Sequence, residues 1–204
     1  MIVSRFGRFP ASAILVFLLS GTACKNRGPL TVIRSIDDMR PDAQPGKTAD
    51  LVLAGTAYPV TLRQTRNAGR VELDLISHGE VLESERYEIG SQSFSLLDAA
   101  EEHFLPALPL LRFPLTIGEN WTWTGTMTTG RIPRPATASV AISTADLFAG
   151  GASHDTVKAM VDLSFEANPG RAPLKRQLSF WFDPNDGLIQ REFGTASVRQ
   201  PPKT

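Results

Sequence analysis

Alternation of apolar and polar residues is the feature that most restricts how this chain folds. It recurs in short runs beyond Thr48, for example in residues 70–76 (RVELDLI), 120–127 (NWTWTGTM) and 156–167 (TVKAMVDLSFEA). Successive side chains of a strand point to opposite faces of a sheet, so these runs predict strands with one buried face. Turn residues between the runs, such as SHGE at 77–80, indicate antiparallel hairpins.

The buried face of each predicted strand follows from the alternation. The expected core residues are Val71, Leu73 and Leu75; Trp121 and Trp123; Val157, Ala159, Val161, Leu163 and Phe165; and Leu174, Leu178, Phe180 and Phe182. A chain of this length can bury one sizeable core. Residues 48–199 are therefore expected to form a single β-rich domain.

One segment fits a helix. SLLDAAEEHFL (95–105) spaces Leu96, Leu97, Ala100 and Phe104 at helical intervals, and the following proline would end the helix. A strand followed by a loop is the alternative for these residues. The predicted fold class is therefore mainly β, with one short helix as an option.

The N-terminal residues 1–23 have the pattern of a secretion signal. Arg5 and Arg8 are the only charges, and they precede an apolar stretch, 11–19, that is too short to span a bilayer. Small residues follow at 20–23. We expect export by the general secretory route, because the two arginines are not adjacent.

Cys24 stands directly after this signal and is the only cysteine of the chain. Its position resembles the lipobox of bacterial lipoproteins, which implies cleavage before Cys24 and attachment of lipid to its thiol. Gly21 departs from the leucine usual there, and Gly21 to Ala23 also suit an ordinary signal peptidase. Lys25 replaces the aspartate that retains lipoproteins at the inner membrane, so the resemblance implies the outer membrane. Periplasmic release is the alternative.

The residues after the cysteine are expected to space the domain from the membrane. Residues 24–47 are rich in proline, glycine and charge, which is typical of a tether, and TVIRSI (31–36) within them is a candidate first edge strand. Residues 200–204 are expected to fray. Removal of 1–23 leaves a formal charge of −2, with no basic block of the kind that binds nucleic acid.

The second half of the chain carries another resemblance. LPLLRFPLTIGENWTWTG and LSFWFDPNDGLIQRE are similar to a pattern of exported bacterial β-proteins, some of which resemble the half-barrels of LolA and LolB. The matching residues are Pro114, Leu115, Gly118, Trp121, Trp181, Asp183, Pro184, Gly187 and Leu188. The resemblance implies a curled antiparallel sheet or half-barrel and brings no catalytic residue with it.

Residues suited to catalysis or metal binding do not form a recognisable motif. The three histidines, His78, His103 and His154, lack metal-binding spacing, and no cofactor motif occurs. Ser153, His154 and Asp155 are neighbours in sequence, whereas a nucleophilic triad converges from separate elements. We expect a loop at 150–155 and a tight turn at 183–187 (DPNDG).

Aromatic residues are the remaining candidates for a site. We expect these residues either to fill the core of the sheet or to line an apolar cavity for a lipid; they are Trp121, Trp123, Phe180 and Phe182. The sequence predicts a membrane-tethered envelope lipoprotein, a non-catalytic binding or structural module with a lipid or protein partner. An envelope hydrolase with an unrecognised site is the alternative.

The lipid anchor is testable through its cysteine. We expect Cys24→Ala to abolish labelling of the chain by palmitate, because the acylated thiol is lost. Labelling in bacteria followed by electrophoresis measures this. Persistent labelling of the variant would disprove attachment at Cys24, and an unlabelled wild type recovered as soluble protein would indicate ordinary secretion.

Overall fold

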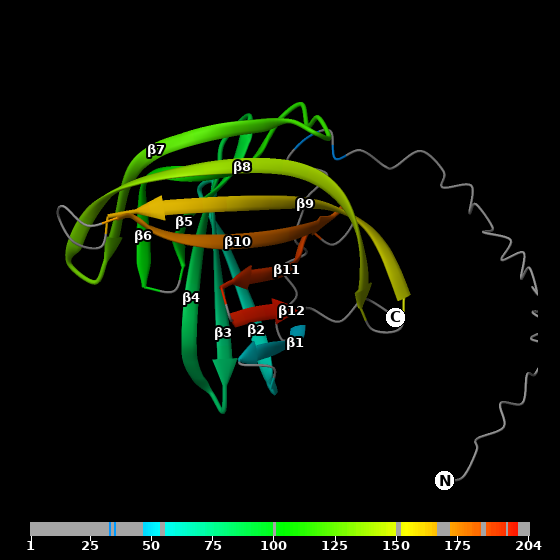
Figure 1. Cartoon of the computed structure of the whole chain (residues 1–204). Helices are drawn as coiled ribbons and strands as arrows, with labels where there is room; N and C mark the ends of the chain where they lie inside the picture. The colour runs from blue at the N-terminus through cyan, green and yellow to red at the C-terminus, as the bar shows by residue number, and fades with distance from the viewer. Residues whose placement is uncertain are drawn as a thin grey trace, which may run out of the picture. The chain divides into compact units, whose positions relative to one another are not determined.

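The computed structural model describes Ile33, Ser35 and residues 47–53, 56–99, 101–149, 152–166, 172–184, 187–194 and 196–199. Figure 1 shows the strands that these residues form. They are β1 (Lys47–Leu53), β2 (Thr56–Asn67), β3 (Arg70–Ser77), β4 (Glu80–Ile89), β5 (Ser93–Ala99), β6 (Glu102–Arg112), β7 (Asn120–Thr129), β8 (Ile132–Ala149), β9 (Ala152–Phe165), β10 (Leu174–Asp183), β11 (Gly187–Phe193) and β12 (Ala196–Arg199).

The strands form one antiparallel sheet that closes on itself. Each strand pairs with its neighbours in the sequence, and β1 pairs with both β2 and β12. The hairpins β2–β3 and β3–β4 turn through Ala68-Gly69 and His78-Gly79, all at positive φ, as type I′ turns require. The predicted mainly β, curled antiparallel sheet is confirmed, and its pairing continues beyond a half-barrel to a full ring.

Opposite walls of the ring approach each other. In Figure 1, β7, β8, β9 and β10 cross above the steeper strands β2, β3 and β4. β6 and β9 are not neighbours in the ring, yet their backbones come close together. Apolar side chains from both walls form one large cluster, which also contains Ile33, a fully buried residue that lies outside the strands.

The burial of individual strands follows the predicted faces. Val71, Leu73 and Leu75 are buried, as are Trp121 and Trp123, while Thr122 and Thr124 between and beyond the tryptophans are exposed. On β9 the residues from Val157 to Leu163 alternate as expected between buried side chains and side chains that are half-buried or exposed. Leu174 is an exception at 51% exposure, because it lies at the start of β10, before the buried part of that strand.

The optional helix at 95–105 is wrong. Residues of this segment belong to β5 and β6, which pair as a hairpin. Leu96 and Phe104 are both buried, as a helical face would require, but they reach the core from two paired strands. Register shifts after Phe94 and Leu96 interrupt the alternation, and this irregularity imitates helical spacing.

The predicted loop at 150–155 is also corrected. β9 begins at Ala152, and Ser153 to Asp155 continue its pairing with β8. The predicted hairpin around residues 183–187 is confirmed, because β10 ends at Asp183 and β11 begins at Gly187. Of residues 1–46, which include the signal, Cys24 and the tether, only Ile33 and Ser35 are described.

Two tryptophans join β6 to β7 where their backbones separate. The strands pair only from Glu102–Leu105 to Thr126–Thr129. Beyond this point β6 contains Pro106 and Pro109, which lack an N–H donor. The indole Nε1 of Trp123 donates to the carbonyl of Pro106 and that of Trp121 to Pro109, each at 3.1 Å. Side-chain hydrogen bonds thus replace the missing backbone ladder.

Gly125 lies where the backbones of β6 and β7 separate. The space around it shows how tightly this junction is packed. A Cβ atom there would lie 2.4 Å from Cζ2 of Trp123 and 2.6 Å from the carbonyl oxygen of Leu105. We expect Gly125→Ala to lower the free energy of unfolding by about 1–3 kcal/mol or more, because the indole and backbone must move. Urea denaturation measures this, and Thr124→Ala, an exposed neighbour, should change it by less than about 0.5 kcal/mol. Equal stability of Gly125→Ala and wild type would contradict the packing.

Candidate functional site

A charged cluster lies inside the ring, where β4 and β11 face each other. The Nε atom of Arg191 donates to Oε1 of Glu85, and the hydroxyl of Tyr87 donates to Oε2 of Glu85 at 2.6 Å. Arg191 and Glu85 are completely buried, and Tyr87 is 1% exposed. The cluster therefore links residues 106 positions apart across the interior of the sheet.

Strand register explains why these polar groups point inward. Arg191 is paired with Phe180 of β10, and directly paired residues share a face. Phe180 belongs to the main hydrophobic cluster. On β4, Glu85 and Tyr87 are two residues apart and so also share a face. The same alternation that buries the aromatic residues therefore buries Arg191 and Glu85.

The protonation states of the cluster are set by burial and by the ion pair. Burial alone would lower the pKa of Arg191, but the Glu85 carboxylate outweighs it and raises that pKa above the usual value. Burial raises the pKa of Tyr87 well above 10.0, and the nearby charge of Glu85 adds to this shift. Arg191 is therefore a cation and Tyr87 a neutral donor.

The ion pair leaves most of the Arg191 guanidinium without a partner. A guanidinium has five N–H donors, and the Glu85 bond uses the one on Nε. Its Nη1 and Nη2 atoms are buried and have no hydrogen-bond partner among the described residues. Unpartnered buried donors cost roughly 1–3 kcal/mol each, and more when charged, so this site favours binding an acceptor.

A second ion pair joins opposite walls closer to solvent. Arg176 of β10 bonds to Glu102 of β6, and their side chains are 27% and 9% exposed. Arg176 is paired with the buried Leu163, so it too starts from the inner face. The two ion pairs thus connect β11 to β4 and β10 to β6 across the ring.

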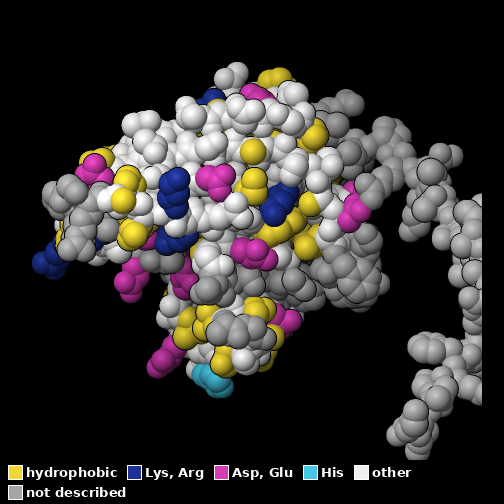
Figure 2. All heavy atoms as spheres, in the orientation of Figure 1, with side chains coloured by type: hydrophobic (Ala, Val, Ile, Leu, Met, Phe, Trp, Pro, Cys, Tyr) yellow, Lys and Arg dark blue, Asp and Glu magenta, His cyan; other side chains and the backbone are white. Residues whose placement is uncertain are grey.

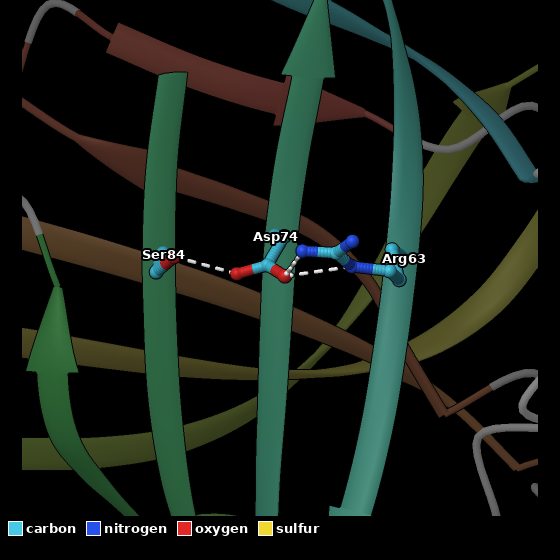
Figure 3. A network of polar contacts seen from close by, with 3 residues as sticks. All are labelled: Arg63, Asp74 and Ser84. Atoms are coloured by element: carbon cyan, nitrogen blue, oxygen red, sulfur yellow. Dashed lines mark hydrogen bonds and ion pairs between the residues drawn. The ribbon is translucent and has the colours of Figure 1, made fainter. Parts of the chain in front are cut away.

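Polar contacts on the outer face have a simpler geometry. Asp74 of β3 accepts hydrogen bonds from Arg63 of β2, at 2.6 and 2.9 Å, and from Ser84 of β4, at 2.5 Å (Figure 3). Partial burial would raise the pKa of Asp74, but the Ser84 bond and the Arg63 bond and charge outweigh it and lower the pKa. The network fastens three adjacent strands and faces away from Leu73 and Leu75.

His103 takes part in a similar series of polar contacts between strands. Its Nδ1 atom lies 2.8 Å from Asp98, and Asp98 also pairs with Arg86 at 2.9 Å. These residues come from β4, β5 and β6, so the contacts again run across strands. In the described part of the chain, no three His, Cys, Asp or Glu side chains are grouped as metal ligands. Nor do these residues include a helix long and apolar enough to cross a membrane.

The four aromatic candidates lie together in the main hydrophobic cluster. Trp121 and Trp123 are 7% and 5% exposed, and Phe180 and Phe182 are fully buried. Edge contacts join Trp123 to Phe104, Phe180 to Phe193 and Phe182 to Phe94. Their role as ligand-lining residues stays a prediction, as does the acylation of Cys24, which lies outside the described residues.

Sequence reasoning missed Glu85 and Arg191, although a signal for them exists. In β4 the spacing of two residues puts Glu85 in phase with Tyr87 and Ile89. In β11 it puts Arg191 in phase with Phe193. A charged residue in phase with the apolar face of a strand must be neutralised when that face is buried. The partner, however, lies on a distant strand.

Apolar side chains also gather on the surface at one end of the ring. Val81 and Leu82, at the start of β4, are 49% and 54% exposed, and Tyr58 near the start of β2 is 50% exposed. Figure 2 shows hydrophobic side chains grouped at this lower end. Contiguous apolar surface is a feature of interaction sites, so this end of the ring is a candidate for one.

Known structures resemble this chain only distantly. The hypothetical lipoprotein YmcC from Escherichia coli is 12% identical, with a TM-score of 0.44 over 83% of this chain and 90% of YmcC. A proposed lipoprotein from Parabacteroides distasonis is 10% identical, with a TM-score of 0.46 over 76% and 93%. A proposed exported protein with a YmcC-like fold from Bacteroides fragilis is 13% identical, with a TM-score of 0.45 over 79% and 97%. No family model and no curated protein matches the chain. Likeness at this level assigns no function.

The network of Figure 3 yields a pH-dependent prediction. At neutral pH we expect Ser84→Ala to lower the free energy of unfolding by roughly 0.5–1.5 kcal/mol, because Asp74 loses a hydrogen bond. The pKa of Asp74 is lowered in the folded chain, so its stabilisation is present above the unfolded pKa and is lost as pH falls through the folded pKa.

The deficit of Ser84→Ala should therefore shrink in acid. Urea denaturation of variant and wild type between about pH 7 and pH 3 measures it. Ser143→Ala, at an exposed serine on β8, is the control and should show no such trend. A deficit that is constant with pH would contradict the role of Ser84 in holding Asp74 ionised.

Proposed function

We propose that this chain is an exported, lipid-anchored protein of the bacterial envelope whose β-domain binds an apolar or amphiphilic molecule without catalysis. The observation that carries this proposal is the buried Arg191, with donors unpartnered among the described residues, inside a largely apolar ring. Binding sites for small molecules are mostly apolar and contain a few well-placed polar groups that orient the ligand. The interior around Arg191, Glu85 and Tyr87 has this composition.

Two further observations support binding of a lipid-like molecule. The signal pattern at residues 1–23 and the position of Cys24 favour attachment to a membrane, where such molecules are abundant. The exposed Tyr58, Val81 and Leu82 offer apolar surface at one end of the ring. In this proposal the tether keeps the binding domain at the membrane surface, and the domain supplies the binding site.

Mass spectrometry of bound molecules tests the proposal. We expect organic extraction of the purified, processed chain to release an amphiphile in roughly equimolar amount, since a ligand held inside the ring would be largely buried and retained during purification. Cys24→Ala, exported by the same signal, should release the same molecule, which separates bound ligand from the covalent anchor. Extracts that contain no more lipid than those of an unrelated exported protein would refute the proposal.

A further inference from the structure

We propose that Arg191 binds the acidic head group, a carboxylate or a phosphate, of the amphiphile held in the ring. This inference rests on the proposed function and specifies the chemistry of its ligand. It is carried by the Nη1 and Nη2 atoms of Arg191, which are buried and have no partner among the described residues.

The orientation of the guanidinium supports an acidic ligand. Glu85 bonds to Nε, so the edge formed by Nη1 and Nη2 is unused. This edge can donate two parallel hydrogen bonds, the arrangement that fits the paired oxygens of a carboxylate or phosphate. A single neutral hydroxyl would leave at least one of the two nitrogen atoms without an acceptor.

The Glu85 carboxylate is shared between Arg191 and Tyr87, so it does not occupy the whole guanidinium and a second anion can bind to the remaining edge. One oxygen of the carboxylate accepts from Arg191, and the other accepts from Tyr87 at 2.6 Å. Glu83 is the neighbouring group that opposes an anion, since its charge also acts on Arg191. It is half-buried, in contrast to the completely buried Glu85, so solvent screens it more strongly.

The apolar side chains around Arg191 would contact the acyl chain of the ligand. Phe94 stacks on Tyr87 with ring centres 5.1 Å apart, and Phe182 contacts Phe94 at 5.7 Å. These rings belong to the cluster that includes Phe180, the partner of Arg191 in the sheet. An acyl chain would contact apolar side chains while its head group neutralises the free edge of Arg191.

Calorimetric titration of the exported Cys24→Ala chain, after delipidation, tests the inference. The probes are laurate, dodecyl phosphate, the neutral 1-dodecanol and inorganic phosphate. We expect laurate and dodecyl phosphate to bind at least about tenfold more tightly than dodecanol, because charge-assisted hydrogen bonds are added to the same apolar contacts. Inorganic phosphate should bind far more weakly than dodecyl phosphate, since it lacks the chain.

Variants identify the guanidinium as the cause. Arg191→Met combined with Glu85→Gln removes both charges and should reduce laurate affinity to that of dodecanol. Glu85→Gln alone should tighten laurate binding, because the competing carboxylate is gone. Arg63→Gln, on the outer face, is the matched control and should leave the preference for laurate unchanged. If the interior variants do not fold, the inference is tested by the ratio of the laurate affinity to the dodecanol affinity of the Cys24→Ala chain.

The outcomes separate this inference from the proposed function. Equal affinity for laurate and dodecanol would overturn the role of Arg191 but leave an apolar binding protein. Binding of inorganic phosphate as tightly as dodecyl phosphate would indicate a free anion as the ligand and would also overturn it. Failure of all four probes, together with empty lipid extracts, would refute the proposed function itself.

Discussion

Closure of the hydrogen-bonded ring gives every strand of the sheet an inner and an outer face. β1 pairs on one side with β2 and on the other with β12, so none of the twelve described strands is left as an open edge. A closed sheet divides its side chains into an inner and an outer set. Each residue in phase with the inner face must then be accommodated in the interior, whatever its chemistry.

The interior solves this requirement in two ways. Most inward residues are aliphatic or aromatic and pack across the ring, helped by the close approach of β6 and β9. The charged ones, Arg191 and Arg176, pair with Glu85 and Glu102 from the opposite wall. A buried pair contributes little net stability, because desolvation offsets the attraction between its charges. The Glu85–Arg191 pair is therefore less important for stability than for the N–H donors of Arg191 that it leaves unpartnered among the described residues.

The strand pairings are not uniformly strong around the ring. β8 and β9 form the longest hairpin, with pairing from Ala136–Phe165 to Ala149–Ala152. Between β6 and β7 the ladder is short, and the indoles of Trp121 and Trp123 complete it through proline carbonyls. On the outer face, Asp74 connects β2, β3 and β4 (Figure 3). Side chains thus secure the sheet at places where the backbone alone does less.

Several of the strands, their buried faces and the hairpins around residues 77–80 and 183–187 could be predicted from the sequence alone. Alternation is a local property, so Val71, Leu73 and Leu75, or Trp121 and Trp123, could be assigned to the core without knowing their neighbours. The hairpin at His78-Gly79 was equally local. The short helix proposed at 95–105 failed because bulges in β5 and β6 disturb the local alternation.

The closure of the sheet and the pairing of charges inside it depend on the tertiary fold. Arg191 and Glu85 are 106 residues apart, and their contact depends on the order and register of all the strands between them. The same holds for the indole of Trp121, whose acceptor is the carbonyl of a proline on β6. Such contacts are non-local, so a pattern that repeats every two residues predicts the face of a side chain but not its partner across the ring.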